Sequence, residues 1–422
     1  MVSPASGTRA VARCDELGIA PYSDLPDALY RAFLTPAHAA ALNKMAEWMR
    51  EAGMAVRLDG AANLIGRYEA EVPGAPALLV ASHIDSVRNA GRYDGPLGIM
   101  LGVECAARLQ AEGRRLPFAL EVIAFGDEEG SRFPESMLCS RAIAGVLKEG
   151  ATAVKDAAGM SVAEALNTFG EHVQVPMPAT GPASAKYQPK DVIGYLEAHI
   201  EQGPVLESEG LAVGVVSGIA AQLRYSIYVS GEAGHAGTAA MHLRKDALTG
   251  AAEMALAVER IAHEGGADLV ATVGQMDVRP GSVNVVPGNV RFSLDVRSGS
   301  ETIRNAAAAR ILEAIAAIAS ARGLGLTSQQ TQDLPASPCD PSLTSLLEVA
   351  MEQAGYLKRT LVSGAGHDAM VVSALCPTAM LFIRCEKGIS HNPAEAVKTE
   401  DAEAALAVMM NFLKLLESRY NG

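Results

Sequence analysis

The sequence lacks the signatures of several large classes of protein. Its six cysteines are scattered and include no Cys-x-x-Cys pair, so we expect buried, reduced thiols rather than disulfides or a thiolate metal site. Positive charge is also scarce, because 35 lysine and arginine residues face 48 aspartate and glutamate residues, for a formal net charge of −13. A general nucleic-acid-binding surface would need clustered lysine and arginine, so we predict no nucleic-acid partner.

Long apolar runs, a serine-nucleophile motif and the common nucleotide-binding motifs are missing too. No stretch approaches the length of a membrane span, and the N-terminal residues MVSPASGTRAVARCDEL contain no apolar core of signal-peptide length. We therefore expect a soluble, cytoplasmic protein without membrane association. The sequence has no Gly-x-Ser-x-Gly motif, and its glycine-rich segments do not match the phosphate-loop or dinucleotide-binding patterns.

The sequence does contain enough apolar residues for two folded domains. Of its 422 residues 49% are hydrophobic, and this length exceeds what a single core usually holds. Residues 78–81, 98–112 and 118–125 have the patterns of strand, helix and strand, a spacing typical of a parallel α/β arrangement. We predict that residues 1–212 and 331–422 together form an α/β domain with a mixed, mostly parallel sheet.

The pattern changes after Gly210. Segments 214–219, 222–230, 269–276 and 290–297 are strand-like, and helical stretches at 243–263 and 301–322 interleave with them. A four-stranded antiparallel sheet with two helices on one face is the economical arrangement of these elements. We predict that residues 213–330 form this α+β domain as an insertion into the first domain.

Two polar residues, His83 and Asp94, follow the apolar strand that ends near Ala81. An apolar helix-like segment begins shortly after Asp94, at Ile99. Ligands and catalytic groups of open α/β sheets lie outside the carboxyl ends of the strands, where these two side chains are expected. Taken alone, the pair could equally be ordinary polar surface residues.

A second strand, Phe118–Phe125, leads directly into Asp127, Glu128 and Glu129. Successive side chains of an extended segment point to opposite sides, so two adjacent glutamates can have different roles. One could bind a metal ion while the other faces a substrate water. The alternative is a solvated acidic loop, which is the commoner case for such a triplet in isolation.

Two further histidines, His199 and His391, lie at the edges of apolar segments. Each alone is more often structural than a metal ligand. Together with His83, Asp94 and a glutamate they form a nitrogen and oxygen donor set that suits two Zn²⁺ or Mn²⁺ ions, or Co²⁺ or Ni²⁺. A carboxylate can bridge two such ions, which can lower the pKa of a water and polarise a carbonyl. A nearby glutamate would accept the proton of that water.

Seven motifs occur in order along the chain: SHIDSVRNAGRYDGPLG, GDEEGSRF, EAHIEQGPVLE, GEAGHAGTAAMHLRKDA, GSVNVVPGNVRFSLDVR, SGAGHDAM and ISHNPAE. Together they resemble the amidase/hydantoinase–carbamoylase branch of the M20 metallopeptidases. That branch includes N-carbamoyl-L-amino-acid hydrolase, allantoate amidohydrolase and β-ureidopropionase.

The resemblance implies a role for each presumed metal-centre residue. One ion would be held by His83, Asp94 and His199, and the other by Asp94, Glu129 and His391. Asp94 would then bridge the two ions, and Glu128 would be the general base. Peptidase-type relatives commonly have a carboxylate at the position of His199, so histidine there favours ureido or amide substrates over peptides.

The resemblance also implies that the inserted domain is a lid through which the chain forms a homodimer. His235 would stabilise an oxyanion, reaching the partner subunit's active site, and Asn284 and Arg297 would bind a substrate carboxylate. Gln202 and the loop Gly364–His367, including Gly366 and His367, would line the pocket. Without the motifs, His235, Asn284 and Arg297 would be ordinary loop, turn and strand-end residues.

One segment departs from the family pattern. The family commonly has Thr-Thr-Pro-Met after its His-Ala-Gly, whereas Thr238 is followed here by Ala239, Ala240 and Met241. The proline that would stiffen this loop is missing. All presumed metal ligands are kept, so the departure concerns substrate positioning.

The expected function is therefore a binuclear amidohydrolase that cleaves a C–N bond of an N-carbamoyl-L-amino acid, or of a ureido acid such as allantoate, with release of ammonia. One alternative is a peptidase or N-acyl-amino-acid deacylase of the same family. Another is a catalytically silent ligand-binding dimer, which the presence of Glu128 and of every presumed ligand disfavours.

Overall fold

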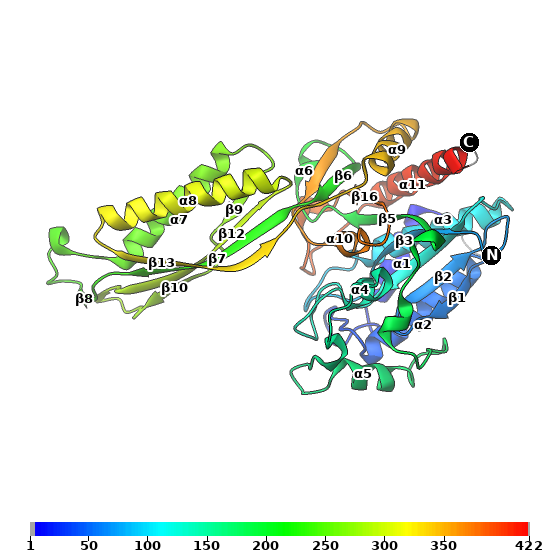
Figure 1. Cartoon of the computed structure of the whole chain (residues 1–422), viewed down its shortest axis with the longest axis horizontal. Helices are drawn as coiled ribbons and strands as arrows, with labels where there is room; N and C mark the ends of the chain where they lie inside the picture. Colours follow the sequence, from blue (N-terminus) through cyan, green and yellow to red (C-terminus); the bar gives the residue numbers. More distant parts are fainter. Residues whose placement is uncertain (1–4, 421–422) are drawn as a thin grey trace. The chain divides into compact units, whose positions relative to one another are not determined.

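The structure of the chain is a computed structural model that describes residues 5–420. It consists of two compact units (Figure 1). The first comprises residues up to Ser217, 339–361 and those from His367 onward, and the second comprises 218–338 and 362–366. The predicted limits were 212/213 and 330/331. The second unit extends beyond 330 because the pairing of its last long strand continues to Leu334.

The first unit is built on a mixed sheet. Its strands β1 and β2 form an antiparallel edge, β4, β3, β5 and β16 are mutually parallel, and β6 runs antiparallel to β16. Every residue of β3 and β4 is buried, as expected for parallel strands covered on both faces. In sheet order the strands are β1 (Ala55–Leu58), β2 (Leu64–Tyr68), β4 (Ala119–Phe125), β3 (Ala77–His83), β5 (Val192–Ile200), β16 (Thr378–Ile383), β6 (Val213–Ile219) and β14 (Ser337–Pro338), with β15 (Thr360–Ser363) also paired to β6.

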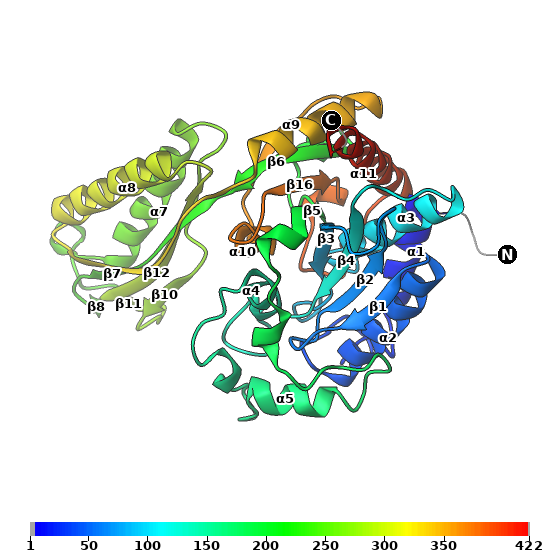
Figure 2. The same ribbon diagram turned by 45° about the vertical axis from the view of Figure 1, so that its right-hand side comes forward.

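Helices pack around this sheet (Figure 2). Helix α3 packs closely on the sheet, where a Cβ at Gly102 would lie 2.9 Å from Val80 Cγ1 and 3.1 Å from Val122 Cγ1. The helix therefore lies directly on the strands that end at the polar residues described below. The helices of this unit are α1 (Gly7–Leu17), α2 (Pro36–Glu51), α3 (Pro96–Ala111), α4 (Leu138–Ala144), α5 (Val162–Phe169), α6 (Val205–Ser208), α9 (Pro341–Gln353), α10 (Ala369–Val372) and α11 (Thr399–Tyr420).

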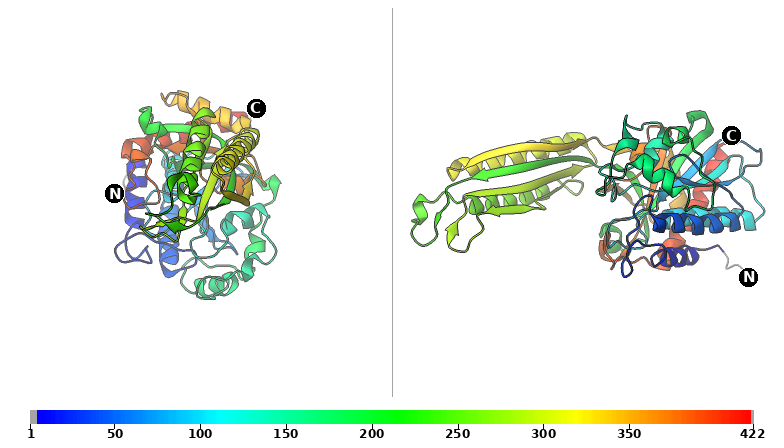
Figure 3. Two further views of the ribbon diagram at one scale, coloured as in Figure 1. Left: turned by 90° about the vertical axis from the view of Figure 1, so that its left-hand side faces the viewer. Right: turned by 90° about the horizontal axis from the view of Figure 1, so that it is seen from below.

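The second unit is an antiparallel sheet with two helices, α7 (Ala247–Glu264) and α8 (Glu301–Ala321), on one face (Figure 3). In β12 the buried residues Val290, Phe292, Leu294 and Val296 alternate with more exposed ones, which is the period-two pattern of a strand with one covered face. The strand order is β10 (Met276–Arg279), β12 (Asn289–Ser298), β7 (Ala221–Ser230) and β13 (Gly325–Leu334), with β9 (Val270–Thr272) also paired to β12 and a small ribbon of β8 (Gly234–His235) and β11 (Val285–Val286).

The predicted fold class, an α/β domain with an inserted α+β domain, is confirmed, but the strands of the insertion differ from the prediction. β13 was missed because its sequence is polar and mostly exposed, without apolar alternation. The predicted strand 269–276 is divided into β9 and the start of β10, with Gly274 between them. β6 joins the sheet of the first unit. Within residues 5–420, no helix is both long and apolar enough to cross a membrane.

Candidate metal centre

The presumed metal ligands come from the carboxyl ends of four neighbouring strands of the first unit. His83 is the last residue of β3, and His199 is the penultimate residue of β5. Glu128 and Glu129 follow β4, and His391 lies in the loop after β16. Since β4, β3, β5 and β16 are parallel and adjacent, their carboxyl ends meet at one edge of the sheet.

His83, Asp94 and His199 form a buried group whose donor atoms lie within 4.8 Å of one another. Asp94 Oδ1 is 3.1 Å from His199 Nε2 and 3.7 Å from His83 Nε2. The opposite ring nitrogens face backbone oxygens, with His83 Nδ1 3.1 Å from Asp85 O and His199 Nδ1 2.9 Å from Ile200 O. Protons on these Nδ1 atoms leave both Nε2 lone pairs directed at the centre.

These two Nε2 atoms are only 3.3 Å apart. Two lone pairs at that distance repel each other unless a cation or a proton lies between them. The donor set therefore fits a divalent metal ion, and its nitrogen and oxygen atoms suit Zn²⁺, Mn²⁺, Co²⁺ or Ni²⁺.

Asp94, Glu129 and His391 form a second group within the same 4.8 Å limit. His391 Nε2 lies 3.1 Å from Asp94 Oδ2 and 3.5 Å from Glu129 Oε1. Asp94 thus presents Oδ1 to the first group and Oδ2 to the second. This division of its oxygens is the geometry that a bridging carboxylate requires.

The electrostatics of the centre differ between its carboxylates. Burial favours a raised pKa for Asp94, but its interactions with His199, His391 and His83 hold the pKa of this carboxyl well below its usual value. For Glu129, burial raises the pKa to about 7. Burial also raises the pKa of Glu128 well above its usual value, which suits a carboxylate that must accept a proton near neutral pH.

Asp85, which the sequence analysis did not select, supports both glutamates. Its buried carboxylate accepts hydrogen bonds from the backbone N–H groups of Glu128 and Glu129, each at 3.1 Å. The available signal was its position two residues after His83, beside the ligand-bearing strand end. The sequence motifs do not indicate a role for Glu395 or Ser390 either.

The predicted pocket residue Gln202 makes its hydrogen bonds to the metal centre itself. Its Nε2 donates to both oxygens of Asp94, at 3.2 and 3.0 Å. His367 is buried with its ring 4.5 Å from that of His199, edge to face. Burial lowers the pKa of His367 well below its usual value, so this imidazole is neutral at pH 7.

The other predicted substrate residues belong to the second unit. His235 in β8 pairs with Val285 in β11, which places it beside Asn284, and the N–H of Ala236 donates to the carbonyl of Asn284 at 2.9 Å. Gly366 is the last residue of the segment 362–366. The structure thus brings His235 and Asn284 together at one small ribbon.

Arg297 lies elsewhere in this unit. Strand β11 of the ribbon is followed in the chain by β12, which begins at Asn289. Arg297 is the penultimate residue of β12. Eight residues of extended chain span roughly 26 Å, so Arg297 and the ribbon are at opposite ends of the strand. The guanidinium of Arg297 is held by Asp295, through Nε at 2.8 Å and Nη2 at 3.0 Å, and Nη1 donates to the carbonyl of Gly364.

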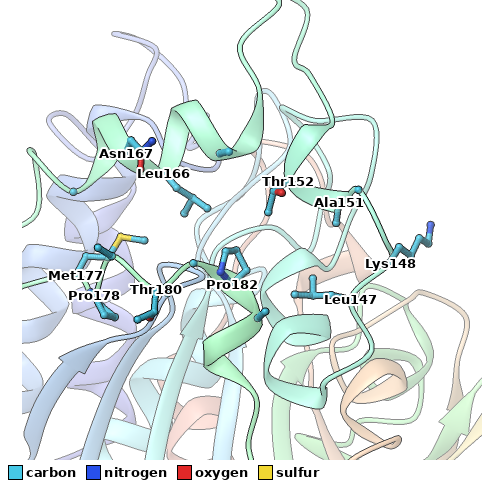
Figure 4. Close-up of a pocket in the computed structure, with 17 residues that line it drawn as sticks. Leu147, Lys148, Ala151, Thr152, Leu166, Asn167, Met177, Pro178, Thr180 and Pro182 are labelled. Carbon is cyan, nitrogen blue, oxygen red and sulfur yellow. The ribbon is translucent and has the colours of Figure 1, made fainter.

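The volume of a pocket does not by itself locate the presumed metal centre, as two pockets show. A pocket of about 660 Å³ lies between α5 and the segments 147–152 and 177–183, and its lining includes none of the predicted site residues (Figure 4). A pocket of about 480 Å³ in the second unit is lined by Arg297, Asp295 and Arg224. The candidate reaction site is therefore identified by the polar groups that meet in the first unit rather than by an apolar cavity.

Comparison with known proteins agrees with this chemistry. Residues 79–415 match the family model of peptidase family M20/M25/M40. An N-carbamoyl-L-amino acid amidohydrolase from Geobacillus stearothermophilus is 40% identical over 366 residues, covering 86% of this chain and 88% of that protein. An allantoate deiminase from Arabidopsis thaliana is 38% identical over 435 residues, covering 96% and 81%. The crystal structure of an amidase of the hydantoinase/carbamoylase family from Burkholderia multivorans superposes with a TM-score of 0.88 at 33% identity, covering 97% of both chains.

Proposed function

Because the chain belongs to peptidase family M20/M25/M40, we propose that it is a binuclear metal-dependent amidohydrolase that cleaves a C–N bond of an N-carbamoyl-L-amino acid or of a ureido acid such as allantoate. The observation that carries this proposal is the pair of donor groups that share Asp94, with a histidine at position 199. The names of the similar proteins from Geobacillus stearothermophilus and Arabidopsis thaliana support the substrate class.

The chain's own residues would divide the work between proton transfer and positioning. Two divalent ions, Zn²⁺ or Mn²⁺, would supply the positive charge that acidifies a water and polarises the substrate carbonyl. Glu128 would take a proton from the attacking water and hand it to the leaving nitrogen. Asp85 would keep the carboxylate of Glu128 in place through the backbone. For a carbamoyl amino acid, the products would be the amino acid, carbon dioxide and ammonia.

Substrate binding would involve a second copy of the chain. Arg297 would bind the substrate carboxylate with a fixed, bidentate guanidinium, which Asp295 already orients. His235 and Asn284 lie at the opposite end of β12 from Arg297, so one inserted domain cannot direct all three at a small substrate. This separation supports a homodimer in which the two copies contribute different residues to one site.

The proposed location is the cytoplasm. All six cysteines are free and buried in the structure, a pattern that suits a reducing compartment.

Ammonia release from a small substrate panel tests the proposed function. The Mn²⁺-loaded protein would be assayed with N-carbamoyl-L-amino acids, N-carbamoyl-β-alanine and allantoate, and the chelator-stripped protein would be the control. We expect metal-dependent release from at least one of them. No release from any of these substrates, with metal bound, would reject the proposal, and cleavage of dipeptides or N-acyl amino acids instead would favour the peptidase or deacylase alternative.

A further inference from the structure

Glu395 is a buried carboxylate, 5% exposed, in the loop after β16 that also carries His391. Its Oε1 accepts hydrogen bonds from the backbone N–H groups of Tyr93, at 2.8 Å, and of Asp94, at 3.1 Å. A single side chain therefore fixes the backbone of the loop that carries Asp94, although 301 positions separate the two residues.

The same loop also holds the side chain of Asp94. Ser390 Oγ is 2.7 Å from Asp94 Oδ2 and 3.3 Å from Glu395 Oε2. His391 Nε2 lies 3.1 Å from the same Oδ2. Residues 390–395 thus contact both the backbone N–H and the carboxylate of Asp94. The same segment places His391 Nε2 next to that carboxylate.

Two local features show how closely this contact is fitted. A Cβ at Gly91 would lie 2.1 Å from Glu395 Cδ, so the carboxylate fits only because residue 91 is glycine. His391 has a φ of 54°, in the left-handed region that residues with side chains seldom adopt. A residue persists in that conformation where its surroundings fix it.

We propose that Glu395 is a positioning residue that sets the spacing between Asp94 and His391, and thereby the affinity of the group Asp94, Glu129 and His391 for its divalent ion. This inference rests on the proposed function, since it takes that group to hold an ion. Without the carboxylate, the two loops lose their shared anchor, and the donor atoms of the group separate. Loss of an outer partner of this kind typically weakens metal binding about 10–100-fold.

The test compares Glu395→Ala with Glu395→Gln in the full-length, chelator-stripped protein. Glutamine keeps an oxygen that accepts from both backbone N–H groups, and its amide can donate to Ser390 Oγ. Calorimetric titration with Mn²⁺ alone should show two binding equivalents in the wild type, with one weakened at least about tenfold in Glu395→Ala and within about threefold of normal in Glu395→Gln. Asp59→Ala is the matched control, because the buried Asp59 carboxylate also accepts backbone N–H groups, from Ala61 and Asn63.

Thermal unfolding without metal, and with saturating Mn²⁺, separates positioning from mere stability. A ligand stabilises the folded state by an amount set by its concentration and affinity. Glu395→Ala should therefore show a smaller Mn²⁺-induced rise in Tm than the wild type. Asp59→Ala should lower the metal-free Tm and leave the Mn²⁺-induced rise unchanged.

Gly91→Ala provides a second route if Glu395→Ala does not fold. Its new Cβ should displace the intact Glu395 carboxylate and weaken Mn²⁺ binding, whereas Gly170→Ala, whose Cβ would meet no atom closer than 3.6 Å, should not. Unchanged Mn²⁺ affinity in Glu395→Ala would overturn this inference but not the proposed function. If Glu395→Ala does not fold, unchanged Mn²⁺ affinity in Gly91→Ala would have the same meaning. A wild-type chain that bound no Mn²⁺ would overturn both this inference and the proposed function.

Discussion

Replacing Asp85 with asparagine should slow turnover while leaving the metal ions bound. The two oxygens of Asp85 each accept one backbone N–H, from Glu128 and Glu129, at 3.1 Å. An asparagine offers one oxygen, and its NH₂ group would face the other N–H. A hydrogen bond to a charged group contributes about 1.5–3 kcal/mol. If the loss of one such bond raises the activation free energy by this full amount, turnover decreases about 10–150-fold, since each 1.36 kcal/mol is a factor of ten.

The same change has an electrostatic signature. The negative charge of Asp85 is one of the influences that raise the pKa of Glu128, after burial and the charges of Asp368 and Glu129. Removing it should lower the pKa of Glu128 and move the acidic limb of the kcat/KM profile to lower pH. A defect that only loosened the loop would slow turnover without moving that limb.

The assay is initial-rate ammonia release by Mn²⁺-loaded enzyme as a function of pH, with metal content measured on the same samples. Asp156→Asn is the matched control, because Asp156 also accepts two backbone N–H groups, from Ala158 and Met160 at 3.0 Å, in a loop outside the metal centre. The reasoning is refuted if Asp85→Asn retains turnover within about threefold of the wild type, given the expected loss of a full charge-assisted hydrogen bond.

Three further predictions concern other parts of the chain. Glu128→Gln should keep both Mn²⁺ equivalents but reduce kcat about 10²–10⁴-fold; turnover within a few-fold of normal would remove Glu128 from the role of general base. Arg297→Ala should raise KM for a carboxylated substrate about tenfold or more with little change in kcat, and an unchanged KM would exclude it from the pocket. Burial lowers the pKa of His38 from 6.5 to about 3, so its neutral form stabilises the fold above pH 6.5, and this stability is lost as the pH falls from 6.5 towards 3. Denaturant unfolding of His38→Asn should therefore depend less on pH than that of the wild type, by about 2 kcal/mol between about pH 6.5 and 4.5, and parallel pH profiles would contradict this.

Much of the fold and of the metal centre could be predicted from the sequence because the relevant signals are local. The apolar strand before His83 and the apolar strand before Glu128 indicate a parallel α/β domain, and the carboxyl ends of parallel strands share one edge. Residue order was therefore enough to expect these side chains near one another. Polar, exposed β13 gave no comparable signal, because its place in the sheet depends on pairing with β7 rather than on its own side chains.

Distances between residues remote in the chain were decided by the tertiary structure alone. The sequence indicates that Asp94 could bridge two ions, but only the strand order brings His391 to Oδ2 and His199 to Oδ1. The support from Asp85 and Glu395 depends on backbone N–H groups, which every residue type except proline carries and which no motif reveals. The composition and motifs of this sequence thus determined which chemistry is available, whereas the packing of loops far apart in the chain determined which atoms meet.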